Sequence, residues 1–156
     1  MIVGVDPGGA TTGIVKRDGT KLLAATLVTN DGDFDAYLAD VEAALEPLTV
    51  VGHLAVEDLT HPNPHLGLAN VTGLLGTAQV LGLVRHLAAG WVEAGDLEGW
   101  VLVPPAGHGS APLRSYPAPL VGERETKGTG RLRHARSAWD IAGAGAVMLG
   151  TRRLVP

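Results

Sequence analysis

Cysteine is absent from this chain of 156 residues, which excludes disulfide bonds, thiolate metal ligands and a cysteine nucleophile. Aromatic residues make up only 4% of the chain and charged residues only 18%. Disorder does not follow from this, because 46% of the residues are hydrophobic and apolar runs recur throughout. We expect a single folded domain over residues 1–156.

A targeting signal is not apparent in residues 1–6, and the cytoplasm is the expected location. Residues 66–84 carry no charge and approach the length of a membrane span. This stretch contains four glycines and several polar residues, and aromatic anchors do not flank it. We therefore predict a buried helix and no membrane contact.

Positive charge is scarce in the first two thirds of the chain and common in the last third. Residues 1–107 carry 4 Lys and Arg against 13 Asp and Glu, whereas residues 108–156 carry 8 against 3. The net charge of −4 hides this asymmetry. A basic final third indicates contact with a polyanion, or else a solvated basic loop and tail.

Turn residues and apolar spacing predict the order of the elements. Apolar runs at residues 2–5, 13–15 and 22–28 predict an antiparallel meander of three strands. Helices are predicted over 33–48, 65–89 and 134–150, with further strands at 54–56 and 100–103 and a long loop over 104–133. This order predicts an α/β fold with a mixed sheet covered on both faces.

Small residues recur every fourth position in the second predicted helix, at Ala69, Gly73 and Thr77. That spacing puts them on one helical face. We predict that this face makes a tight contact.

Two acidic residues at the ends of predicted strands are candidates for binding a cation or a phosphate. Asp6 ends the first strand inside the glycine-rich stretch 4–13, and Glu57 follows the buried strand 54–56. A carboxylate beside bare backbone can hold a hard cation or approach a phosphate, although capping of a glycine-rich turn is the alternative for Asp6. Asp58 is expected to face away from Glu57, because neighbouring strand residues point to opposite faces.

Asp140 lies on the last predicted helix among Ala, Gly, Ile and Trp residues. A buried carboxylate without a partner is costly, so Asp140 is expected to have one. The two alternatives are an ion pair with Arg136 and a metal site assisted by Ser137, which share its helical face.

The order of these acids resembles that of the RNase H-like nucleases, and within them the RuvC family of Holliday-junction resolvases. The resemblance lies in residues 3–8 with Thr12 and Gly13, in residues 55–57, and in residues 137–144. It implies a three-layer α/β/α fold in which a meander and two parallel strands form a five-stranded sheet. It also implies that Asp6, Glu57 and Asp140 are the catalytic metal ligands.

The resemblance further implies Mg²⁺ as the cofactor, with Mn²⁺ as a substitute and two ions per site. Its fourth ligand is usually Asp or His at the position of Ser137, so Ser137 or His134 is the expected fourth ligand. His134 stands six residues before Asp140, about 120° away around an ideal helix.

The implied activity is that of an endodeoxyribonuclease in recombination and repair, acting as a homodimer on four-way or other branched DNA. No nucleotide cofactor is expected. Basic residues of the last third are the expected phosphate contacts: Arg114, Arg124, Lys127, Arg131, Arg133 and Arg136.

Three other functions remain open from the sequence. Residues 6–13 also resemble the first phosphate hairpin of actin-like and sugar-kinase ATPases. A nucleic-acid-binding dimer without catalysis and an RNA-processing nuclease of the YqgF type are the others.

Overall fold

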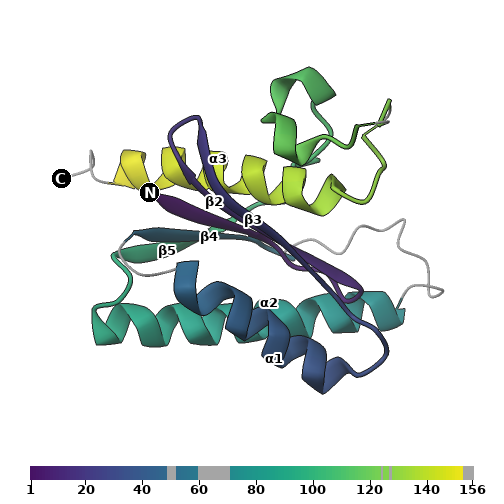
Figure 1. The fold of residues 1–156 in the computed structure, drawn as a ribbon. Coiled ribbons are helices and arrows are strands. Elements are labelled where there is room, and N and C mark those ends of the chain that lie inside the picture. Colours follow the sequence, from purple (N-terminus) through teal and green to yellow (C-terminus); the bar gives the residue numbers. More distant parts are fainter. Residues whose placement is uncertain (49–51, 60–70, 124, 127, 153–156) are drawn as a thin grey trace.

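A five-stranded sheet forms the centre of the protein in a computed structural model that describes residues 1–48, 52–59, 71–123, 125–126 and 128–152 (Figure 1). The strands are β1 (Ile2–Asp6), β2 (Thr11–Asp18), β3 (Lys21–Thr29), β4 (His53–Glu57) and β5 (Gly99–Val103). Their order is β3-β2-β1-β4-β5, in which β1, β2 and β3 pair antiparallel and β1, β4 and β5 pair parallel. The predicted mixed sheet with its meander and two parallel strands is confirmed.

Helices cover both faces of the sheet. They are α1 (Phe34–Leu45), α2 (Val71–Ala94) and α3 (Arg133–Arg152), with the 3-10 turns η1 (Glu46–Leu48), η3 (Leu113–Ser115) and η4 (Ala118–Leu120). Figure 1 shows α1 and α2 on one face and α3 on the other. The protein therefore has the predicted three-layer α/β/α architecture.

Local sequence signals explain where these elements begin and turn. The carboxylate of Asp33 accepts a hydrogen bond from the backbone N–H of Ala36, which caps the first turn of α1. The turn between β2 and β3 contains Gly19 at φ 55°, a left-handed conformation that glycine adopts without a steric penalty. The predicted helix over 33–48 is thus α1 followed by η1.

The second helix differs in extent from its prediction. It continues to Ala94, five residues beyond the predicted end, because Ala88 and Trp91 still pack on the core there. Ala69 and the predicted start at residue 65 lie outside the described residues. Among the described helices, none is long and apolar enough to cross a membrane.

Hydrophobic clusters cover both faces of the sheet. Val5, Ile14 and Val56 pack against α1 and α2, and each is completely buried. On the face of α3, Ala55 and Val101 pack against Ile141, and a further cluster includes Val15 and Trp139. Full burial of one large aliphatic side chain contributes about 2 kcal/mol, so these clusters carry much of the driving force for folding.

Two glycines allow α3 to lie directly on β1 and β2. A Cβ atom at Gly4 would stand 2.0 Å from the carbonyl oxygen of Ala138, and one at Gly13 would stand 2.1 Å from that of His134. Both clashes are with backbone, which cannot swing aside. Glycine at these positions therefore sets the distance and the rotation of α3.

We expect Gly4→Ala to destabilise the fold by about 3 kcal/mol, because α3 would have to move off the sheet to accommodate the methyl group. Urea unfolding measures this change. Gly82→Ala is the matched control: its Cβ would meet nothing within 4 Å. Alanine there should stabilise α2 by about 1 kcal/mol. Equal stability of the G4A variant and the native protein would contradict the close contact.

Candidate active site

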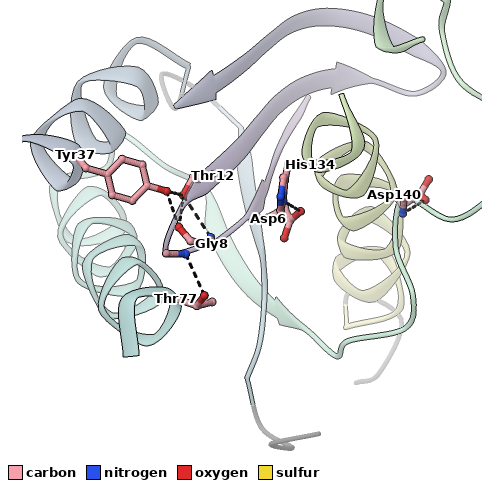
Figure 2. A network of polar contacts seen from close by, with 9 residues as sticks. Asp6, Gly8, Thr12, Tyr37, Thr77, His134 and Asp140 are labelled. Atoms are coloured by element: carbon pink, nitrogen blue, oxygen red, sulfur yellow. Dashed lines mark hydrogen bonds and ion pairs between the residues drawn. The ribbon is translucent and has the colours of Figure 1, made fainter. Parts of the chain in front are cut away.

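A network of hydroxyl groups holds the glycine-rich turn that follows Asp6 (Figure 2). The hydroxyl oxygens of Thr12 and Tyr37 lie 2.6 Å apart, and the Tyr37 hydroxyl donates to the carbonyl of Gly8. The backbone N–H of Gly9 donates to the hydroxyl of Thr77 on α2, over 3.1 Å. Residues from β2, α1 and α2 thus hold the turn next to the end of β1.

Small residues of α2 approach this turn closely. A Cβ at Gly9 would lie 2.9 Å from the carbonyl oxygen of Gly73 and 3.2 Å from the Cα of Gly76. The described part of the predicted small-residue face therefore makes a tight contact, with the β1–β2 turn as its partner.

Asp6 lies beside a histidine from the start of α3. The Nδ1 atom of His134 is 2.8 Å from Oδ2 of Asp6, whose residue is only 8% exposed (Figure 2). A carboxylate accepts hydrogen bonds, so the Nδ1–H of the imidazole donates and fixes the direction of the Asp6 side chain.

Glu57 is the last residue of β4, which runs parallel to β1. Val5 pairs with Val56 in the parallel register of β1 and β4, which brings the next residues, Asp6 and Glu57, to the same edge of the sheet. Asp58 engages its own neighbour, accepting a hydrogen bond from the N–H of Leu59.

The pKa of the Glu57 carboxyl is shifted by its surroundings. Burial raises the pKa of the Glu57 carboxyl, and the negative charge of Asp6 raises this pKa further. Positive charge on His108, Arg133 and His134 opposes the rise. Two acids and several basic groups therefore act on one another at this edge.

A cleft of about 480 Å³ opens between these groups. Its wall includes Glu57, Arg133 and His134 together with the turn at residues 8–11. A second groove next to it is lined by Thr11, Arg131 and Arg133 among others. The acidic centre thus has a basic border on the side of α3.

Asp140, the third acid that the resemblance implies, is hydrogen-bonded to groups outside this cleft. Its Oδ2 accepts hydrogen bonds from the N–H of Gly109 and the hydroxyl of Tyr116, each at 2.8 Å. Figure 2 shows Asp140 on the flank of α3 away from Asp6. Helix periodicity is the reason, since Asp140 is about 120° around the helix from His134, which faces Asp6.

The two residues expected as alternative fourth ligands are in different surroundings. His134 contacts Asp6, whereas Ser137 is buried, with its backbone next to Gly109. Within the described residues, no group of three His, Asp or Glu side chains is arranged to hold a metal ion. Glu57 and His134 line the cleft, Asp6 lies next to them through its contact with His134, and Asp140 has other partners.

Arg136 is a buried structural residue, which corrects its expected contact with a phosphate. Its guanidinium is completely buried and donates to both carboxylate oxygens of Glu125, at 2.7 and 2.8 Å, and to the carbonyls of Leu120 and Gly128. The ion pair with Asp140, one of the two alternatives from the sequence, is replaced by this pair with Glu125. Arg136 instead ties the irregular segment before α3 to that helix.

The structure describes three of the other expected phosphate contacts, and all three are exposed. Arg131 and Arg133 are exposed at the groove, and Arg114 is exposed on η3. Arg124 and Lys127 lie outside the described residues.

Sequence reasoning missed the partners within the 104–133 segment. Glu125 and Tyr116 lie in irregular structure, where no periodicity links them to Arg136 and Asp140. His108 lies in the same segment, and its charge acts on Glu57. In the sequence, only the two glycines that flank His108 mark this position as a special turn.

Comparison with known proteins supports the fold. No protein-family model matches the chain and no curated protein does. Thermus thermophilus RuvC, solved in complex with a Holliday junction substrate, matches with a TM-score of 0.60 and 21% identity, over 96% of this chain and 95% of that chain. A second structure of Thermus thermophilus RuvC matches with a TM-score of 0.55 and 22% identity, over 96% of each chain.

The class that these matches and the sheet order define is the RNase H-like α/β fold. Within that class, the solved structures it resembles are those of RuvC.

We expect Glu125→Gln to destabilise the protein by about 3 kcal/mol at pH 7, because a buried guanidinium would lose its counter-charge. The Arg136 guanidinium lowers the pKa of Glu125 to about 2. The unfolded pKa is about 4.3, so the stabilisation is present above that pH and is lost as the pH falls toward 2.

Chemical denaturation between pH 7 and pH 2 measures this difference in the free energy of unfolding. The two proteins should converge at the acidic end. Glu123→Gln, which removes an exposed acid nearby, serves as the control and should change little. A gap between native protein and E125Q that stays constant down to pH 2 would argue against the ion pair.

Proposed function

We propose that this protein is a divalent-metal-dependent endonuclease for branched DNA, with Asp6 and Glu57 as its reaction centre. The observation that carries the proposal is the meeting of these two carboxylates at the ends of neighbouring parallel strands, beside His134 and a basic border. RuvC, whose fold the chain shares, was solved with a Holliday junction substrate. Four-way DNA is therefore the substrate that we propose.

The donor set of the cleft fits Mg²⁺ or Mn²⁺. Mg²⁺ is commonly held by one or two carboxylates together with substrate phosphates and water, and Asp6 and Glu57 provide that number. When bound, such an ion would activate a water and stabilise charge on the phosphodiester. With Asp140 on another flank of α3, these two carboxylates support one protein-held ion rather than the two first expected.

The chain's own residues then have distinct roles. His134 orients Asp6 through the Nδ1 hydrogen bond, as partners of metal-binding carboxylates generally do. Arg131 and Arg133 would bind phosphates along the groove, which leads the strand to the acids. The products would carry 5′-phosphate and 3′-hydroxyl ends.

A homodimer is the form that we propose for cleavage. A four-way junction is symmetric, and paired cuts require two sites related by a twofold axis.

Binding of branched DNA without cleavage is the second candidate function. The position of Asp140 outside the cleft favours it, because the expected third acid is not at the centre. The ATP-binding alternative is less favoured: the N–H groups of Gly8 and Gly9 are engaged with the hydroxyls of Thr12 and Thr77. A phosphate hairpin would need such amides for its ligand.

We expect the native protein to cut four-way DNA in Mg²⁺ or Mn²⁺ and to be inactive in a chelator. Asp6→Asn and Glu57→Gln should each lower the cleavage rate by at least about 100-fold. Loss of a residue that only supports a metal ligand already costs about 10- to 100-fold, and loss of a ligand itself should cost more. Binding of the junction should survive, since arginines supply it. Cleavage assays on four-way, flap and linear DNA and on RNA, together with gel-shift titrations, measure both properties.

Asp40→Asn is the matched control, because Asp40 is an exposed acid on α1, across the sheet from α3. Normal cutting by the D6N variant would show that the site is assigned wrongly. Junction binding by the native protein without cutting under any of these metal conditions would favour the second candidate function.

We expect Arg131→Gln to weaken junction binding and to reduce the slope of log affinity against log salt by about 1, the loss of one phosphate contact. Fluorescence anisotropy at several salt concentrations measures the slope. Arg85→Gln, at an exposed position on α2, should leave it unchanged. An unaltered slope in the R131Q variant would exclude a phosphate contact at that residue.

A further inference from the structure

A tight glycine turn stands beside the start of α3. Gly107 and Gly109 have φ angles of 66° and 80°, in the left-handed region that other residues rarely adopt. The hydroxyl and the N–H of Ser110 both donate to the carbonyl of Gly107 and close the turn. His108 supplies the ionisable side chain of this turn.

The turn rests directly on the helix backbone. A Cβ at Gly109 would lie 3.0 Å from the carbonyl oxygen of Arg133 and 3.0 Å from the amide nitrogen of Ser137. These atoms flank His134, the residue that contacts Asp6. The position of the turn is therefore defined relative to the acidic cleft.

Asp140 ties the turn to α3. A single oxygen of its carboxylate accepts from the N–H of Gly109 and from the hydroxyl of Tyr116, while that hydroxyl accepts from the N–H of Ala111. Burial and the charge of Asp140 raise the pKa of Tyr116 to about 12, so this hydroxyl keeps its proton and donates at neutral pH. Two groups of the segment before α3 thus donate to one carboxylate oxygen, and a third donates to the Tyr116 hydroxyl.

His108 belongs to this turn and is close enough to Glu57, a residue of the cleft wall, for its charge to be felt there. Its Nε2 lies 3.2 Å from the carbonyl oxygen of Pro104, which restrains the ring from the side of β5. Its charge acts on Glu57, together with the charges of Arg133 and His134. A positively charged imidazole in this position would attract a phosphate that enters the cleft.

We propose that Asp140 is a positioning residue that holds the turn at residues 107–109 on α3 and thereby presents His108 to the DNA phosphate at the cleft. This inference rests on the proposed function, and gives Asp140 a role other than that of a metal ligand. The inference also predicts that Asp140→Asn keeps the turn in place. Because one oxygen accepts both hydrogen bonds, the amide oxygen of an asparagine can accept them too.

The test compares Asp140→Asn with Asp140→Ala and His108→Ala in single-turnover cleavage of four-way DNA. The D140N variant should keep a rate close to that of the native protein. D140A and H108A should each lose about 10- to 100-fold in rate, the usual range for outer-shell partners, with a much smaller change in junction affinity. The double variant D140A/H108A should be no slower than the slower single variant, because both changes remove the same interaction.

A second readout does not depend on cleavage. The NMR signal of the His108 imidazole, assigned with the H108A variant, should shift when four-way DNA is added to the native protein and to D140N. It should shift much less in D140A. Tyr116→Phe, which removes one of the two donors and keeps the ring, should be intermediate and covers the case in which D140A does not fold.

Three results would overturn the inference. The first is a D140N variant as impaired as D140A, because Asp140 would then act through its charge. The second is a double variant whose losses multiply, and the third is a His108 signal that is insensitive to DNA in the native protein. If the native protein binds junctions but cuts none, the nuclease proposal fails, and the NMR comparison still decides whether Asp140 positions His108.

Discussion

The close contact between α3 and the first two strands is the constraint on which the candidate site depends. Gly4 and Gly13 let the helix backbone touch the sheet, and any larger residue would collide with the carbonyl oxygens of Ala138 and His134. A helix held at this distance has little freedom to rotate about its axis. Its rotation decides that His134 meets Asp6 and that Asp140 faces the irregular segment outside.

The order of the strands in the sheet determines where the two acids of the site lie. Parallel strands end at the same edge, so the pairing of β1 with β4 carries Asp6 and Glu57 to one place although they are far apart in the chain. The hydroxyl network of Thr12, Tyr37 and Thr77 then keeps the adjoining turn from moving into this space. Packing on one face and hydrogen bonding on the other thus shape a single cleft.

Two partly buried polar contacts organise the irregular segment before α3. Arg136 binds Glu125, and Asp140 binds Gly109 and Tyr116, so neighbouring turns of the helix anchor different parts of this segment. Both residues were expected to contact a substrate or a metal ion. Charged residues on an apolar helix can instead be satisfied by the chain itself, because burying a charge without a partner is more costly than ordering a loop around it.

The sequence alone determined the elements, since the periodicity of apolar residues and the Asp–Gly and glycine-rich turns are local properties that report which face of each segment is buried. It also singled out Asp6 and Glu57, because strand ends can be recognised from the chain. Only the tertiary structure decided which residues of α3 face these acids. That choice depends on the rotation of a helix against a sheet, and a difference of six residues, between His134 and Asp140, turns a side chain through about a third of a circle.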